Sequence, residues 1–185
     1  MNVFAYCDQA FERSMRWVAG VEPVTCPPTT CATFEPGWLE YQDLIVIDLH
    51  GERGLDYWFA VVDGPLPGRV VALRADQIRQ ADLDGAVVFA TSCYLGEDDN
   101  PMLQALLEAG ASYVIAGDGE NYAGARKIAG AGLLAIFFRM FLEAGASPMH
   151  ALNTAKQSMK IVATNAKAKR DALSFRAFGR EENLA

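Results

Sequence analysis

Short apolar runs alternate with amphipathic segments along most of the chain, and this alternation predicts strands and helices in turn. The apolar runs are rich in β-branched residues, which is typical of buried strands. They lie near Val3–Tyr6, near Val24, and over Asp43–Leu49, Ala86–Ser92 and Tyr113–Gly117. Strands that alternate with helices are typical of a doubly wound α/β sheet. We therefore expect a mostly parallel sheet between two layers of helices, an α/β/α sandwich.

The segments between these runs carry recognisable helix starts and stops. We predict helices over Asp8–Val18, Asp76–Ala81, Asn100–Gly110, Arg126–Ala144 and Ser147–Ala166, and a last strand over Ser174–Gly179. The first of these helices is expected to begin at an Asp N-cap and to stop at a glycine, and the third has proline in its first turn.

One region breaks the alternation of strands and helices. Asp56–Val62 and Arg69–Leu73 flank Asp63–Gly68, whose Gly and Pro residues force a chain reversal. This pattern predicts a β-hairpin inserted after the strand that ends at His50. Such a hairpin is placed to overhang the edge of the sheet.

Composition and charge narrow the function classes. The 185 residues fit one domain, 1–185, and 51% of them are hydrophobic. No apolar run is long enough to cross a bilayer and no secretory signal is visible, so we expect a soluble cytoplasmic protein without a membrane partner. The net charge of −7 argues against nucleic acid as a partner. The basic stretch Lys160–Arg170 is read as a solvated helix face.

The four cysteines are expected to be free thiols in a protein that is not exported. Cys26 and Cys31 lack the spacing and the second ligand pair of a zinc site, so no metal is predicted. Cys7, at the end of an apolar strand, is expected in the core. Gly117-x-Gly119 imitates a dinucleotide fingerprint, but its third glycine is missing, and no cofactor is predicted.

Two strand ends carry the candidate chemistry. One strand runs into His50-Gly51 and another into Cys93. Because the carboxyl ends of parallel strands share one edge, the imidazole and the thiol are expected to meet there, as base and nucleophile. The N–H groups of Gly51 and Cys93 are candidates for an oxyanion hole. The other histidine, His150, is expected to be partly buried in a structural role, and free cysteines are themselves often core residues.

The order of short motifs resembles the caspase-like cysteine peptidases, most closely the CHAT domains related to separase. The resemblance rests on Asp48-Leu-His-Gly51 and on Ala90-Thr-Ser-Cys-Tyr-Leu-Gly96, and it extends over nearly the whole chain. It implies a caspase-like sandwich in which His50 is the general base or acid and Cys93 attacks the peptide bond to form a thioester. A regulatory or sensor partner chain is also implied.

The chain departs from that pattern in its specificity residues. Relatives that cleave after basic residues often have an acid two positions before the cysteine, where this chain has Thr91. Asp48 and Asp118 are therefore candidates for the substrate pocket together with Thr91. The acidic run Glu97–Asp99 is assigned to the start of a helix, where negative charge is favoured. Self-cleavage near Arg126 or Lys127 is a further hypothesis, since an activation loop is expected there.

Two alternatives to a peptidase stay open from the sequence. The chain is also compatible with a catalytically inactive member of the same fold that serves as an interaction or scaffold module. An unrelated doubly wound domain is the third interpretation, because a fold does not fix a function. The peptidase interpretation predicts a peptide or protein substrate.

Overall fold

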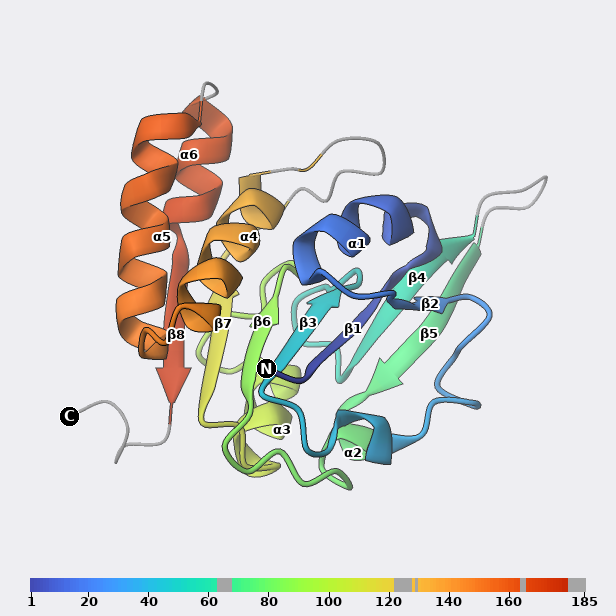
Figure 1. The fold of residues 1–185 in the computed structure, drawn as a ribbon. Coiled ribbons are helices and arrows are strands. Elements are labelled where there is room, and N and C mark those ends of the chain that lie inside the picture. Colours follow the sequence, from blue (N-terminus) through green and yellow to red (C-terminus); the bar gives the residue numbers. More distant parts are fainter. Residues whose placement is uncertain (63–67, 122–127, 129, 164–165, 180–185) are drawn as a thin grey trace.

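A six-stranded sheet lies at the centre of the protein in the computed structural model, which describes residues 1–62, 68–121, 128, 130–163 and 166–179 (Figure 1). The strands follow the order β2-β1-β3-β6-β7-β8. They are β1 (Val3–Asp8), β2 (Val24–Cys26), β3 (Leu44–Asp48), β6 (Val87–Ala90), β7 (Tyr113–Gly117) and β8 (Phe175–Gly179). All neighbouring pairs are parallel except β7 and β8, which are antiparallel. The predicted, mostly parallel sheet is confirmed.

Helices cover both faces of this sheet, as the figure shows (Figure 1). One face packs against α1 (Glu12–Ala19), α4 (Gly130–Glu143), α5 (Pro148–Val162) and α6 (Ala166–Leu173), and the other against α2 (Ala75–Ile78) and α3 (Pro101–Glu108). Two short 3-10 helices, η1 (Gln9–Phe11) and η2 (Pro36–Leu39), lie in the connections. The α/β/α sandwich expected from the alternation of segments is therefore confirmed.

A separate two-stranded sheet is formed by the antiparallel strands β4 (Tyr57–Val62) and β5 (Gly68–Arg74). It is the hairpin predicted after His50, and its reversal at 63–67 lies outside the described residues. The Tyr6 hydroxyl donates a hydrogen bond to the Ala72 carbonyl at 3.2 Å, which ties β5 to β1. His50 and Phe59 form an isolated antiparallel bridge, which ties β4 to the end of β3.

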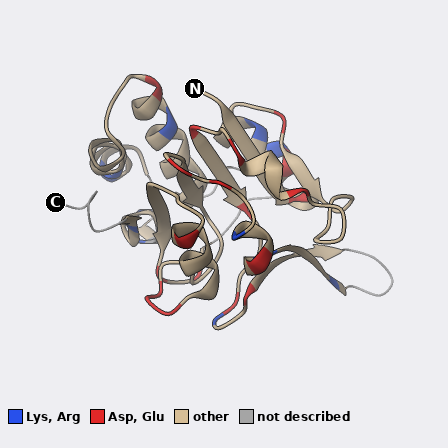
Figure 2. Ribbon diagram, turned by 90° about the horizontal axis from the view of Figure 1, so that it is seen from below, with Lys and Arg blue, Asp and Glu red and all other residues tan. Residues whose placement is uncertain are grey.

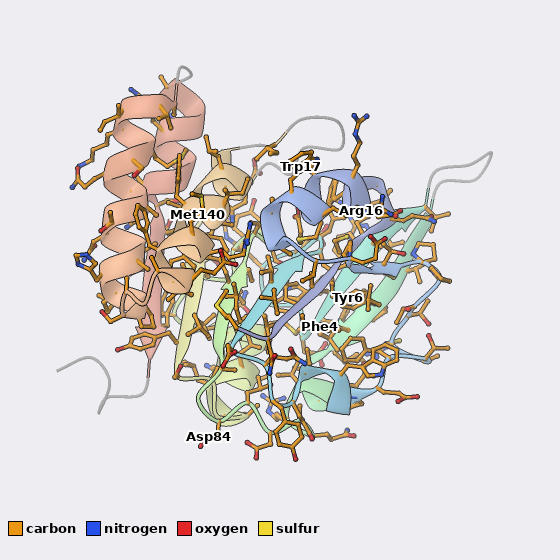
Figure 3. The ribbon with its side chains drawn as sticks, in the orientation of Figure 1. Phe4, Tyr6, Arg16, Trp17, Asp84 and Met140 are labelled. Atoms are coloured by element: carbon orange, nitrogen blue, oxygen red, sulfur yellow. The ribbon has the colours of Figure 1, made fainter. Side chains whose placement is uncertain are left out.

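Two clusters of buried side chains, one on each face of the sheet, form the core. On one face Tyr6 stacks on Phe34 with ring centroids 5.1 Å apart, and on the other Phe89 stacks on Phe175 at 5.3 Å. Figure 3 shows Tyr6 within the molecule, whereas Trp17 on α1 points outward and is 69% exposed. Aromatic pairs of this kind add about 0.5–1.5 kcal/mol each to the burial of their area.

Helix boundaries differ from the sequence expectation at several points. The first helix was predicted to begin at Asp8, but that residue ends β1 and caps η1, and α1 begins at Glu12. The predicted helix 147–166 is divided, because α5 ends at Val162 and Ala163 is extended with ψ 117°. The run from Ile161 to Thr164 contains three β-branched residues, which disfavour a helix.

Charged residues are spread over the ribbon, and Lys and Arg lie scattered among Asp and Glu (Figure 2). Lys160 and Arg170, at the two ends of the predicted basic face, are exposed. Among the described helices, none has the length and apolar character needed to cross a membrane.

Candidate active site

The carboxyl ends of β3 and β6 lie side by side and carry the candidate residues. Ile47 pairs with Ala90, and the Thr91 N–H donates to the Ile47 carbonyl at 2.9 Å. The two segments that follow β3 and β6 therefore stay adjacent beyond the ends of the strands. Because side chains alternate between the two faces of a strand, Asp48 and Thr91 project to the same face as Val46 and Phe89. His50 and Cys93 follow two residues later on each chain.

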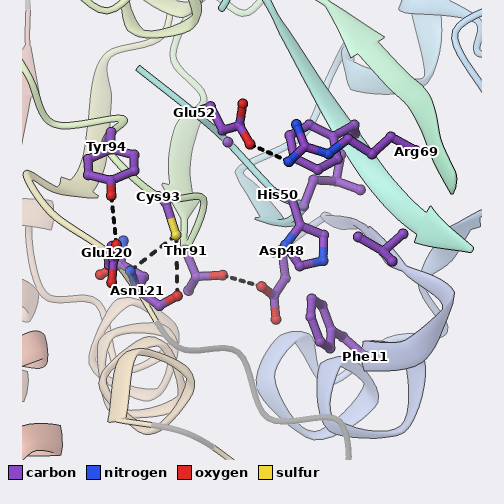
Figure 4. Close-up of a pocket in the computed structure, with 14 residues that line it drawn as sticks. Phe11, Asp48, His50, Glu52, Arg69, Thr91, Cys93, Tyr94, Glu120 and Asn121 are labelled. Carbon is purple, nitrogen blue, oxygen red and sulfur yellow. Dashed lines mark hydrogen bonds and ion pairs between the residues drawn. The ribbon is translucent and has the colours of Figure 1, made fainter. Parts of the chain in front are cut away.

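A pocket of about 470 Å³ opens at this edge of the sheet, between the strand ends, the hairpin and the start of the first helix (Figure 4). Its walls combine apolar, acidic and reactive side chains. The lining residues are Phe11, Asp48, Leu49, His50, Gly51, Glu52, Phe59, Val61, Arg69, Thr91, Cys93, Tyr94, Glu120 and Asn121. The pocket thus brings together His50, Gly51 and Cys93, together with two of the three residues expected to contact substrate.

A buried carboxylate holds the imidazole of His50. Its Nε2 lies 3.3 Å from Oδ2 of Asp8, whose side chain is 1% exposed. Asp8 also accepts hydrogen bonds from the backbone N–H groups of Ala10 (2.8 Å) and Val61 (2.7 Å). Burial alone would raise the pKa of Asp8, but the hydrogen bonds from His50, Val61 and Ala10 outweigh it and hold that pKa below its ordinary value.

Two aromatic rings contact the imidazole of His50. Phe59 from β4 stacks on the His50 ring at 5.5 Å between centroids, and Phe11 from η1 contacts it at 5.4 Å. The His50 side chain is still 35% exposed. The ring is therefore restrained on several sides and remains open to the pocket.

The Cys93 thiol is partly buried and is bonded to backbone rather than to the imidazole. Its Sγ donates to the Asn121 carbonyl and accepts from the Asn121 N–H, both at 3.3 Å. In Figure 4 the sulfur and the His50 ring lie on opposite sides of the pocket. Burial raises the pKa of Cys93 above its ordinary value, although the Asn121 N–H acts in the opposite direction. The free protein therefore holds a thiol, which requires a base for its activation.

Close backbone approach joins the two loops that follow β3 and β6. A Cβ atom placed on Gly51 would lie 2.7 Å from the Cys93 carbonyl oxygen. Only glycine fits there without displacing the chain that carries the thiol. The residue after the cysteine, Tyr94, adopts a left-handed conformation with φ 62°, which is unfavourable for a non-glycine residue and is found often at functional sites.

Side chains next to the pocket form contacts between the loop after β3, the loop after β6 and the segment that ends at Asn121. Arg53, beyond the histidine, lies over the Tyr94 ring at 4.3 Å and pairs with Glu97 at 2.8 Å. The Tyr94 hydroxyl donates to Glu120 at 2.9 Å, next to the residue that bonds the sulfur. These contacts connect the segments that carry His50, Cys93 and Asn121.

Asp48 and Thr91 interact directly within the pocket. The Thr91 hydroxyl donates to Asp48 Oδ1 at 2.7 Å, as Figure 4 shows. Burial raises the pKa of Asp48 to about 6, although the hydrogen bond from Thr91 and the nearby His50 act against the shift. The neutral form of this carboxyl therefore persists to a higher pH than that of an ordinary aspartate.

The remaining expectations from the sequence have mixed outcomes. Asp118 does not line the pocket. It is exposed, and its Oδ2 lies 3.9 Å from Nη2 of Arg176 on the antiparallel strand β8. His150 was expected to be partly buried, but it is exposed on α5. Cys7 is buried in the core, as predicted. Arg126 and Lys127, the residues of the self-cleavage hypothesis, lie outside the described residues.

Two residues of the site had not been identified from the sequence. Asp8 was interpreted as a helix N-cap, and it does cap η1, but the same carboxylate also holds the imidazole. The only signal available was its place after an apolar strand, as for His50 and Cys93. Asn121 acts through its backbone N–H and carbonyl, which no side-chain pattern reveals.

Comparison of the sequence with protein-family models and with curated proteins finds no match. Solved structures with a similar fold include the Arg-specific cysteine proteinase gingipain R (RGPB), with 13% identity and a TM-score of 0.50 over 95% of this chain and 45% of that one. The complex of Porphyromonas gingivalis RgpB pro- and mature domains gives 12% and 0.52, over 98% and 48%. A structure described as a protease gives 10% and 0.52, over 97% and 47%.

The chain therefore spans a little under half the length of the solved structures it resembles. At these identities the likeness concerns the fold, which is the caspase-like arrangement of a mostly parallel sheet between helices. The expected caspase-like sandwich is confirmed. The more specific assignment to the CHAT branch stays a prediction from the sequence motifs.

Proposed function

We propose that the protein is a caspase-like cysteine endopeptidase in which Cys93 is the nucleophile and His50 the general base and acid. The observation that carries this proposal is that both residues, on neighbouring strand ends, line one pocket. The caspase-like fold, shared with cysteine proteinases, supports the same reaction class.

The contact between His50 and Asp8 supports a definite assignment of the two ring nitrogens. Nε2 keeps its proton and donates a hydrogen bond to the Asp8 carboxylate, which leaves the lone pair of Nδ1 for the reacting groups. When a substrate carbonyl enters the pocket, the Cys93 thiol passes its proton to Nδ1 and Sγ bonds to the carbonyl carbon. His50 then gives that proton to the leaving amine, the C–N bond breaks, and a thioester forms.

The second half of the reaction uses the same groups. A water molecule gives one proton to His50 and adds to the thioester carbonyl, and the C–S bond breaks as the thiol regains that proton. The N–H groups of Gly51 and Cys93 are the proposed donors to the oxyanion; in support, both residues line the pocket and their backbones approach closely. Loss of one such donor typically slows the reaction by about 100- to 1,000-fold.

The alternative is an inactive interaction or scaffold module of the same fold. One observation favours it: Sγ is bonded to the Asn121 backbone, and burial raises the pKa of the Cys93 thiol. In this alternative the cysteine is structural and the pocket has no reaction to catalyse. The same experiment separates it from the peptidase.

A screen of peptides with a fluorogenic leaving group tests the proposed function. We expect hydrolysis by the native chain and no hydrolysis above background by Cys93→Ser or His50→Ala. Cys31→Ser is the matched control, because Cys31 is partly exposed and does not line the pocket. Hydrolysis that survives Cys93→Ser, or a native chain that cleaves no peptide of the library, contradicts the proposal.

A further inference from the structure

The pocket beside Cys93 has apolar walls and an excess of negative charge. Among the described residues that line it, three carry a carboxylate (Asp48, Glu52 and Glu120) and one carries a guanidinium (Arg69). Arg69 is paired with Glu52 at 2.6 Å and lies over the Phe59 ring at 4.4 Å, so its charge is already matched. Glu120 accepts the hydrogen bond from Tyr94. The described lining of the pocket therefore carries a net negative charge.

Asp48 differs from the other two carboxylates in its surroundings. In the described part of the chain, no Lys, Arg or His nitrogen forms an ion pair with it, and its one hydrogen-bond donor is the Thr91 hydroxyl on Oδ1. A partly buried carboxylate without a cation is unfavourable, because its lost hydration is only partly replaced. A cationic group that reaches the Asp48 carboxylate would supply the missing partner.

The position of Asp48 relative to Cys93 fits a long cationic side chain. The Thr91 hydroxyl is bonded to Asp48, and Thr91 precedes Cys93 by two residues. Two residues of extended chain span at most about 7 Å, which limits the distance between the Cα atoms of Thr91 and Cys93. Lys and Arg carry their charge on stems of three or four methylene groups, which can pack on apolar surface. Phe11 supplies such surface in the same pocket (Figure 4).

We propose that Asp48 selects a Lys or Arg side chain on the residue that carries the scissile carbonyl. This inference rests on the proposed peptidase function and assigns its substrate class. The carboxylate comes from the strand that leads to His50, while the strand that leads to Cys93 contributes the neutral Thr91. Thr91 holds one carboxylate oxygen, and the other is left for the cation.

Four peptides that differ only in the residue before the scissile bond test this assignment. That residue is Lys, Arg, Glu or norleucine, the last being an uncharged side chain of similar length. We expect kcat/KM for the Lys and Arg peptides to exceed that for norleucine by about 10- to 100-fold, the range of a hydrogen bond to a charged group. Asp48→Asn should remove most of this preference by lowering kcat/KM for the Lys and Arg peptides toward that for norleucine.

Asp76→Asn is the matched control, since Asp76 is exposed on α2 and does not line the pocket. It should retain the native preference. Faster cleavage of the Glu or norleucine peptide by the native chain overturns the substrate assignment and leaves the peptidase intact. A preference for Lys and Arg that survives Asp48→Asn also overturns it.

A measurement without turnover separates this inference from the proposed function. Butylguanidinium at millimolar concentration should slow the alkylation of Cys93 by iodoacetamide in the native chain, and butanol should not. In Asp48→Asn the protection should disappear. If no peptide is hydrolysed but this protection is observed, the cation subsite stands and the peptidase function fails. Equal alkylation rates with and without butylguanidinium in the native chain overturn the subsite.

Discussion

Asp8 Oδ2 lies 3.3 Å from His50 Nε2, and the same carboxylate accepts backbone hydrogen bonds from η1 and from the hairpin. One buried side chain at the end of β1 therefore connects three parts of the site. The hairpin is held over the pocket by the group that orients the imidazole. Asp8 is a positioning residue in the proposed reaction, because it acts through His50 and does not line the pocket.

Replacing Asp8 by Asn should lower kcat while the fold is retained. The amide has nearly the same shape, but its NH₂ group cannot accept a hydrogen bond. It must replace Oδ1, which accepts from Ala10, or Oδ2, which accepts from Val61 and faces Nε2. Either the side chain shifts away from the imidazole, or the ring proton moves to Nδ1, where the proposed base requires a lone pair. An inverted tautomer of this kind lowers kcat by about 10⁴ in the Ser-His-Asp triad, and we expect a loss of about 100-fold or more. The measurement is kcat on a cleaved peptide.

Comparing the stability of Asp8→Asn at several pH values with its kcat at pH 7 distinguishes a positioning role from a structural one. The pKa of Asp8 is depressed in the fold, so its contribution to stability is present at neutral pH and is lost as the pH falls below about 4. The unfolding free energy of Asp8→Asn and the native chain should therefore converge in acid. If Asp8→Asn keeps native kcat at pH 7, the proposed role of Asp8 in orienting His50 is wrong.

Local patterns in the sequence were sufficient to predict most of the sheet. A buried parallel strand needs a continuous apolar run, and the runs that end at His50 and Cys93 have no competing interpretation as helices because they are short and β-branched. The shared edge of parallel strands then brings the two side chains to one pocket. The hairpin was equally predictable, since the Gly and Pro residues between its strands leave few other conformations.

The remaining parts of the site depend on contacts between distant segments. Asp8 carries the signal of an N-cap, and only the packing of the hairpin against β1 gives it a second role. Asn121 holds the sulfur through main-chain atoms, which are common to every residue. Asp118 is drawn toward Arg176 by the antiparallel return of β8, and the direction of that strand was not encoded in its own residues.

Alkylation of Cys93 should show a raised thiol pKa in the free protein. Burial favours the neutral thiol, so the rate with iodoacetamide should rise with pH through a midpoint above the ordinary cysteine value of about 8.5. His50→Ala should move this midpoint little, because the sulfur is bonded to Asn121 and not to the imidazole. Peptide mapping by mass spectrometry would measure the extent of alkylation at Cys93. A midpoint near pH 6 would instead indicate a preformed thiolate-imidazolium pair.

Gly51→Ala should impair the site more than an alanine elsewhere would. The new Cβ would lie 2.7 Å from the Cys93 carbonyl oxygen, so one of the two loops must shift. A small shift at a catalytic centre costs about 100-fold in rate, and we expect kcat/KM to fall by at least that factor. Gly37→Ala is the control, because nothing lies within 4 Å of its Cβ position. Equal activity of the two variants would show that the close approach has no functional consequence.

Asp48→Asn should stabilise the protein at neutral pH, even though it removes the proposed specificity. Burial raises the pKa of Asp48 to about 6, above the value of about 3.9 expected in the unfolded chain. The folded state therefore binds the proton more tightly, and stability falls as the pH rises from about 4 to about 6. A shift of this size corresponds to at most roughly 3 kcal/mol above pH 6. Asn carries no charge, so this cost is absent in the variant.

The measurement is the free energy of unfolding in urea for the native chain and for Asp48→Asn, at pH 4 and at pH 8. The two proteins should be similar at pH 4, and Asp48→Asn should be the more stable at pH 8. A cation in the pocket reverses the relation, since millimolar butylguanidinium should stabilise only the native chain by binding to its folded state. If Asp48→Asn is the less stable protein at pH 8, the carboxylate is a satisfied structural group and does not await a cationic partner.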